Sequence, residues 1–162
     1  MRGLRIAAVT AVIACLTAAQ ARAEGGAVTL HFFESAVCPV CLQAKKDLPR
    51  LRKKYPALNV IAYQVRNGRG QIDAANEKNI SRLLNMLSSI DRKLNGRPFV
   101  IHDRAAHRFV LSGGVPYYEK KISATTTVRK EMGLPIFVLG DKALVGYNPF
   151  DLEREIRGLA AR

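Results

Sequence analysis

Two cysteines separated by two residues, Cys38 and Cys41, are the side chains of this chain whose type and spacing best fit a chemical reaction. Thiols at this spacing exchange disulfides with a partner, because attack by one thiolate forms a mixed disulfide that the second thiol resolves. A bridge between them would close a very small loop, whose stabilising effect is small in the chain-entropy model. Chemistry therefore explains the pair better than a structural staple does, and a passive disulfide stays as an alternative.

A metal site is the second alternative for the same two thiols. Two cysteines supply half of the four ligands of a structural zinc site. The others would have to come from His31, His102 or His107, which lie outside the cysteine motif. We expect His31 to be a structural histidine on a strand and the other two to be solvated. Copper(I) accepts two thiolates more readily, so a copper- or other metal-binding carrier is the alternative function.

The elements around the cysteines would place Cys38 at the start of a helix. Residues 28–33 have the composition of a strand, and an apolar stripe at helical spacing follows over 39–54. Pro39 suits the first turn, because its φ is helical and its missing N–H needs no partner there. The free N–H groups of a helix N-terminus favour a thiolate at Cys38, while Cys41 lies one turn further on the buried face. We therefore expect Cys38 to be the nucleophile and Cys41 the resolving thiol.

The N-terminal residues have the features of an export signal. Arg2 and Arg5 precede an uncharged apolar run over residues 6–16, and Ala21 and Ala23 supply the small side chains that signal peptidase requires. The apolar run has about half of the ~20 residues that a membrane-spanning helix needs. We therefore expect cleavage after Ala23.

A lipoprotein signal is the alternative for this segment. The sequence Val-Ile-Ala before Cys15 resembles the lipobox of bacterial lipoproteins, in which the cysteine is lipidated and becomes the new N-terminus. We expect residues 1–23 to be a signal peptide and residues 24–162 to form one domain, attached to a membrane if Cys15 is lipidated. With either signal the domain would work outside the cytoplasm, in a periplasmic or otherwise extracytoplasmic compartment.

The rest of the chain predicts an α/β domain with a mixed central sheet covered by helices on both faces. The expected elements are a strand at 59–65, a helix at 74–94, short strands at 98–101 and 108–111, a weak helix at 123–132, a hairpin formed by 134–139 and 143–146, and a last helix from residue 149. Asn148 is the expected N-cap of that last helix.

The chain resembles the thioredoxin superfamily, and within it the small exported thioredoxin- and glutaredoxin-like oxidoreductases. The resemblance depends on a strand that leads into a C-P-x-C motif at a helix start, and on a later hairpin that opens with Gly133-Leu134-Pro135. In the family this proline is cis and packs beside the dithiol. Carried over, Pro135 is the cis-proline and the backbone of Leu134 meets the substrate, as do Pro39 and Val40 between the cysteines.

Three features depart from the family pattern. Many members place a buried acid six residues before the first cysteine, where this chain has Phe32, and Glu34 is the nearest acid. Pro98 also precedes a strand and is a rival to Pro135 as the cis-proline. The segment 96–123 is an addition to the minimal thioredoxin-like fold.

The function expected from the motif and the resemblance is thiol-disulfide exchange with protein substrates outside the cytoplasm. The dithiol of Cys38 and Cys41 would itself be the redox centre, so no cofactor is expected. A membrane or soluble redox partner would recharge it, and its role as oxidant, reductant or isomerase is open. No nucleotide-binding loop, serine-hydrolase motif or paired carboxylates appear, and nucleic-acid binding fits poorly with export.

Overall fold

A computed structural model describes residues 27–162 of the chain as an α/β fold with eight strands in one mixed sheet and three helices. The predicted signal peptide over residues 1–23, including Cys15, lies outside the described residues. Among the residues that are described, no helix combines the length and the apolar composition needed to cross a membrane.

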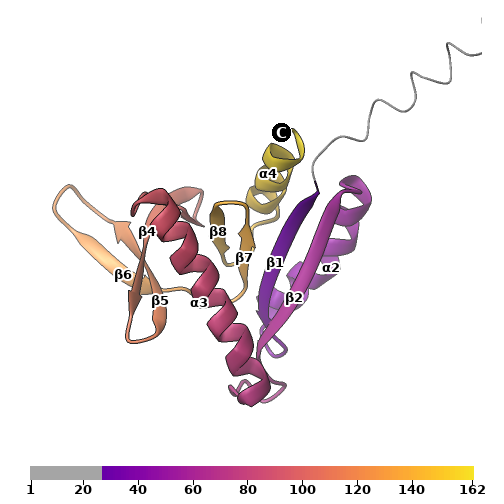
Figure 1. Ribbon diagram of the computed structural model, residues 1–162, viewed down its shortest axis with the longest axis horizontal. Helices are drawn as coiled ribbons and strands as arrows, with labels where there is room; N and C mark the ends of the chain where they lie inside the picture. Colours follow the sequence, from indigo (N-terminus) through magenta and orange to yellow (C-terminus); the bar gives the residue numbers. More distant parts are fainter. Residues whose placement is uncertain (1–26) are drawn as a thin grey trace, which may run out of the picture.

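The first two and the last two strands of the chain form one half of the sheet, and the four strands between them form the other half (Figure 1). They are β1 (Val28–Ser35), α2 (Pro39–Lys54), β2 (Leu58–Arg66), α3 (Ala74–Leu94), β3 (Val100–His102), β4 (Ala105–Ser112), β5 (Val115–Lys121), β6 (Thr127–Glu131), β7 (Ile136–Leu139), β8 (Lys142–Val145) and α4 (Pro149–Ala160).

The strand order β2-β1-β7-β8-β3-β4-β5-β6 gives the sheet a parallel set of strands that end at one edge. β1 pairs parallel to β2 and antiparallel to β7, β7 pairs antiparallel to β8, and β8 pairs parallel to β3. The carboxyl ends of β1, β2, β3 and β8 therefore lie at the same edge. In α/β sheets of this kind, the residues that follow the carboxyl ends of the strands are those that form sites.

Helices cover both faces of the sheet, as the sequence predicts. One core joins β1 and β7 to α2 and α4, and its fully buried side chains include Phe32, Leu51 and Ile156. The other core joins the opposite face to α3, through residues such as Phe33 and Leu87. Neighbouring residues of β1 thus serve opposite cores, because side chains alternate across a strand. Packing against helices on both faces therefore fixes the position of the edge at which β1, β2, β3 and β8 end.

The helices begin and end where local chemistry predicts. Asp73 caps α3 by accepting a hydrogen bond from the N–H of Asn76 at 3.0 Å, and Asn95 ends it in the left-handed region with a φ of 51°. Asn148 caps α4 in the predicted way, with Pro149 in the first turn. The helix expected over residues 74–94 has these same bounds in the structure.

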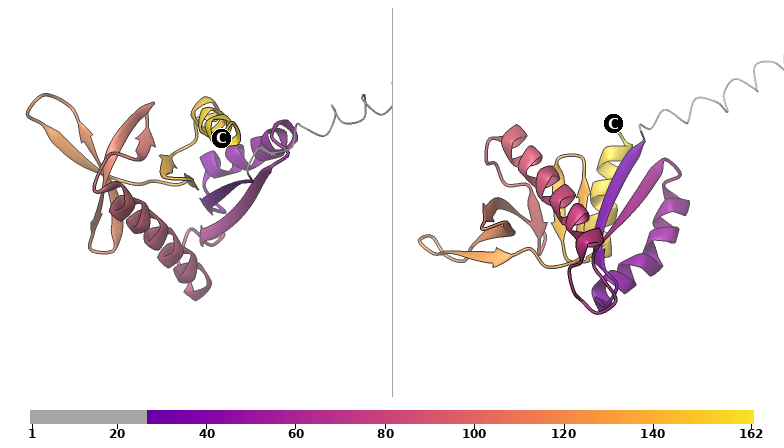
Figure 2. Two further views of the ribbon diagram at one scale, coloured as in Figure 1. Left: turned by 45° about the horizontal axis from the view of Figure 1, so that its top comes forward. Right: turned by 60° about the horizontal axis from the view of Figure 1, so that its bottom comes forward.

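The additional segment is larger and differently built than the sequence indicated. β4, β5 and β6 extend the sheet beyond β3 and lie on the opposite side of α3 from β1 and β2, as all views show (Figures 1 and 2). The helix expected over 123–132 is wrong, because β6 is a strand there and pairs antiparallel with β5. The β-branched side chains of Thr127 and Val128 begin this strand, and such side chains disfavour a helix and fit an extended strand.

Candidate functional site

The cysteine pair lies at the edge where the parallel strands end. β1 ends at Ser35, a short turn follows, and the N–H of Cys38 donates to the carbonyl of Ser35 at 3.2 Å. Cys38 has extended backbone angles and is the N-cap of α2, and Pro39 and Val40 occupy its first turn. The predicted strand-to-helix placement of the cysteines is therefore what the structure shows.

The sulfur of Cys38 is held between the helix start and the loop before β7. It accepts a hydrogen bond from the N–H of Cys41 at 3.3 Å, and its thiol points to the carbonyl oxygen of Leu134 at 3.7 Å. Cys38 is half-buried, and both cysteines are free thiols that lie side by side. A backbone N–H of the first turn of α2 therefore points at the sulfur of Cys38.

Cys41 has a different environment. Its side chain is fully buried in the core that includes Ala44 and Leu48 of α2. Burial above all, together with a hydrogen bond to Cys38, raises the pKa of its thiol to about 12. Because the thiolate is the reactive form, we expect Cys41 to react slowly with outside reagents at neutral pH.

Glu34 is the buried acid near the dithiol, a point that the sequence left open. Only 5% of its surface is exposed, and its Oε1 forms an ion pair with Nζ of Lys45 at 2.6 Å. Its other oxygen, Oε2, has no hydrogen-bond partner among residues 27–162. The charge of Glu34 adds to the forces that raise the pKa of Cys41. A buried carboxylate therefore opposes ionisation of the Cys41 thiol, from a position in β1 two residues beyond Phe32.

The loop before β7 supplies the other wall of the site. The peptide bond between Leu134 and Pro135 is cis, and within residues 27–162 no such bond precedes Pro98. The preference for Pro135 over Pro98 is therefore confirmed. Pro135 is buried, and its carbonyl accepts a hydrogen bond from the N–H of Gly146 at 2.8 Å. The backbone of Leu134 thus faces Cys38 from a loop anchored to the end of β8.

The histidines lie in places that do not complete a metal site with the cysteines. His31 shares a hydrogen bond with the hydroxyl of Tyr63 at 3.1 Å, and burial followed by the charge of Arg82 lowers its pKa. Across residues 27–162, no group of three or more His, Cys, Asp or Glu side chains is arranged to hold a metal ion.

The expectation that His107 is solvated is wrong. His107 is 7% exposed within β4, and its Nε2–H donates to the carbonyl of His102 at 3.2 Å. The turn between the two strands is shorter than predicted, because Asp103 and Arg104 with positive φ complete it and leave His107 in the strand.

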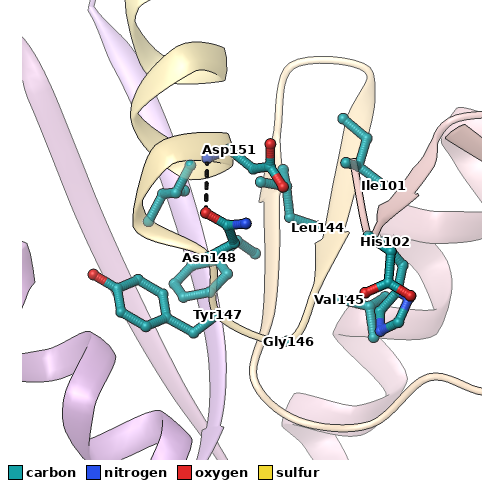
Figure 3. A pocket seen from close by; sticks show the side chains of 11 residues that line it. Ile101, His102, Leu144, Val145, Gly146, Tyr147, Asn148 and Asp151 are labelled. Atoms are coloured by element: carbon teal, nitrogen blue, oxygen red, sulfur yellow. Dashed lines mark hydrogen bonds and ion pairs between the residues drawn. The ribbon is translucent and has the colours of Figure 1, made fainter. Parts of the chain in front are cut away.

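A second hollow lies at the same edge, beside the loop that carries Pro135 (Figure 3). It has a volume of about 230 Å³ and lies between the start of α4 and the end of β3, with Asn148 and Asp151 on one side and His102 on the other. Oδ1 of Asp151 is paired with Arg154 at 2.9 Å. This hollow could not be predicted from the sequence, because its lining comes from the four elements β3, β7, β8 and α4 and contains no motif. It contains no thiol, so the cysteine pair is the site with an evident reaction.

Comparisons of the chain with family models, with curated proteins and with solved structures find no match.

Proposed function

We propose that the chain is an extracytoplasmic thiol-disulfide oxidoreductase with a thioredoxin-like fold. The fold proposal is supported by the strands β2-β1-β7-β8 with α2, α3 and α4 around them, to which β3–β6 add a lateral extension. The signal sequence expected over residues 1–23 supports the location. The observation that carries the function is the half-buried Cys38 at the start of α2, with its sulfur against the carbonyl of Leu134.

The exchange takes place in two balanced steps. The Cys38 thiolate attacks one sulfur of a substrate disulfide, a mixed disulfide forms, and the leaving substrate thiolate takes up a proton. Cys41 then loses its proton and attacks the sulfur of Cys38, which releases the second substrate thiol and leaves a Cys38–Cys41 disulfide. Two electrons pass from the dithiol to the substrate, and the same steps in reverse oxidise a substrate. Leu134, Pro39 and Val40 are the proposed substrate contacts, and Pro135 shapes the groove beside the dithiol.

The redox equilibrium of the domain with glutathione, scored by a thiol-specific gel shift, tests this proposal. A potential near about −120 mV would make the domain a disulfide donor, and one near about −270 mV would make it a reductant. A Cys38→Ser variant is the control and should not equilibrate. If the parent pair does not equilibrate either, the proposal fails. If a parent protein that does not equilibrate with glutathione binds copper(I) tightly and stoichiometrically, the alternative function as a metal carrier is favoured.

A further inference from the structure

An apolar groove on the α3 side of the sheet shares Leu134 with the surroundings of Cys38. It has a volume of about 210 Å³ and lies between α3 and the added strands β5 and β6. Its lining includes Ile72, Ile80, Leu84, Val115, Pro116 and Leu134. The side chains of Ile80, Leu84 and Val115 are half-buried, so they form a surface that a ligand can reach. The groove thus exists because the extension stands opposite α3.

Leu134 belongs both to this groove and to the cysteine site. Its carbonyl oxygen lies 3.7 Å from the Cys38 sulfur, and the residue lines the groove. On the other side, the loop before α3 approaches the turn before Cys38, since a Cβ at Gly70 would lie 3.5 Å from Cγ2 of Val37. A chain bound at Cys38 therefore has a short path into the groove.

Large apolar side chains stay exposed along this path. Val37 is 49% exposed, Val40 is 44% exposed and Ile72 is 51% exposed. A continuous run of exposed apolar residues around a site is a mark of an interaction surface. Single exposed residues need no such explanation, but Val37 precedes Cys38, Val40 lies in the first turn after it, and Ile72 lines the groove.

The size and chemistry of the groove indicate its occupant. Its volume lies below the roughly 300–1,000 Å³ of pockets that enclose drug-sized ligands. Arg66 and Glu131 are its charged lining residues, and the rest of the lining is apolar apart from Gly114. Such a groove offers little to orient a polar molecule, whereas it can bury one bulky apolar side chain.

We propose that this groove binds a bulky apolar side chain of a protein substrate whose cysteine reacts at Cys38. This inference depends on the proposed exchange at Cys38 and names its substrate class: extended segments in which leucine, phenylalanine or a similar residue lies close to the cysteine. Such segments are exposed in chains that have not finished folding. The groove gives them an affinity that small thiols such as glutathione lack.

Paired peptides test the proposal. Two peptides of equal length and charge carry one cysteine in a mixed disulfide with glutathione, and the flanking residues are leucine and phenylalanine in one and glycine and serine in the other. The measurement is the ratio of the second-order rate constants with which the reduced protein releases the two peptides. We expect the apolar peptide to react about tenfold faster or more, the discrimination typical of one apolar side chain in a pocket.

Substitutions locate the source of that preference. Ile72→Ser and Leu84→Ser should lower the ratio toward one, while Ile122→Ser, at a side chain 64% exposed beyond β5 and outside the groove lining, should keep the parent ratio. Ile72 precedes α3, so its substitution tests the groove even if Leu84→Ser unfolds the helix. A parent ratio near one, or groove variants that keep the full ratio, would overturn the inference. Absence of exchange with both peptides would overturn the proposed function itself.

Discussion

At the scale of residues, the two thiols of the motif differ in what surrounds their sulfurs. Cys38 receives a backbone N–H and is half-exposed, whereas Cys41 is enclosed by the apolar face of α2. Glu34 places a buried negative charge on the same side as Cys41. In the proposed exchange, these environments suit the two chemically identical groups to different tasks, since a thiol must ionise before it reacts.

The first prediction concerns the order of alkylation. Reduced protein treated with iodoacetamide at pH 7.5 should be modified at Cys38 first, because burial raises the pKa of Cys41 to about 12 and leaves almost no thiolate there. We expect the rate at Cys41 to be at least about tenfold lower. Mass spectrometry of the digested protein over time measures both rates. Faster modification of Cys41 would contradict the assigned roles.

The second prediction concerns Glu34. The Glu34→Gln substitution should lower the pKa of Cys41, because it removes a negative charge that opposes formation of a nearby thiolate. The pH dependence of alkylation, measured in a Cys38→Ser background with and without the substitution, reports this shift directly. Glu119→Gln in the same background is the control, since Glu119 lies in β5 and pairs with Arg129. An unchanged or upward-shifted profile would show that Glu34 does not act on Cys41.

At the scale of elements, α2 and α4 are tied together across the core they share. The hydroxyl of Tyr147, just before α4, donates to Oδ2 of Asp47 in α2 at 2.7 Å. Further along, Lys54 of α2 pairs with Glu153 of α4. Because Cys38 begins α2 and Tyr147 follows the end of β8, these contacts connect the cysteine helix to the strand edge that carries the site.

The third prediction concerns this connection and its pH dependence. The hydrogen bond from Tyr147 lowers the pKa of Asp47 below its usual 3.8. A depressed carboxyl pKa contributes stability above the pKa of the unfolded chain, and that contribution disappears as pH falls through the folded value. Tyr147→Phe should therefore be less stable than the parent at pH 7, by an amount that shrinks as the pH falls below about 4.

Urea denaturation at several pH values measures this difference. Tyr117→Phe is a matched control, because Tyr117 lies in β5, near the end of the strand order that is opposite β1 and β2. A difference between Tyr147→Phe and the parent that stays constant down to pH 2 would mean that the hydrogen bond does not favour the ionised Asp47.

At the scale of the whole molecule, the extension shares one core with the strands that carry the site. Phe99, Phe109, Tyr118 and Met132 pack in the same buried cluster as α3 and β7. Phe109 and Phe99 have ring centroids 5.7 Å apart. The extension is therefore part of the cooperative structure rather than a separate unit.

The fourth prediction follows from this shared core. Phe109→Ala should lower the free energy of unfolding by about 3–5 kcal/mol, the usual cost of emptying a buried aromatic site. Unfolding should stay a single transition by fluorescence of tyrosine and by circular dichroism. Leu111→Ala, on the same strand but 45% exposed, should change stability by about 0.5 kcal/mol or less. A loss in two separate steps for Phe109→Ala would show that the extension unfolds on its own.

Much of the fold was predictable because its signals are local. The apolar stripe of α3, the caps at Asp73 and Asn148 and the hairpin turn at Gly140 depend on neighbouring residues alone. The extension was harder, because a strand such as β6 exists through pairing with β5 and its own sequence, mostly exposed, has no alternation to detect. Pairing with β5 therefore determines the conformation of residues 127–131, for which local propensity gives only a weak preference.

The candidate site likewise has a part that could be predicted from local sequence and a part that could not. Cys38, Cys41 and Pro135 are visible in short motifs, and the structure brings all three to one edge. The burial of Glu34 and the apolar groove were not predictable, because both depend on elements distant in sequence that meet in space. For Glu34 the available sequence signal was an acid near the end of an apolar strand. The four successive buried residues over 32–35 and the register shift between Glu34 and Ser35 are visible only in the structure.

The pairing of β1 with β7 has a consequence for how the chain acquires its activity during synthesis. β1 is among the first described elements to emerge, yet its neighbour in the sheet, with the Leu134 carbonyl that faces Cys38, is among the last. Contacts between such distant segments form late, because the intervening chain must first be brought together. A nascent chain therefore carries both thiols long before it has the surface that selects a partner. The proposed selection of substrates would therefore begin only after β7 has been synthesised and paired with β1.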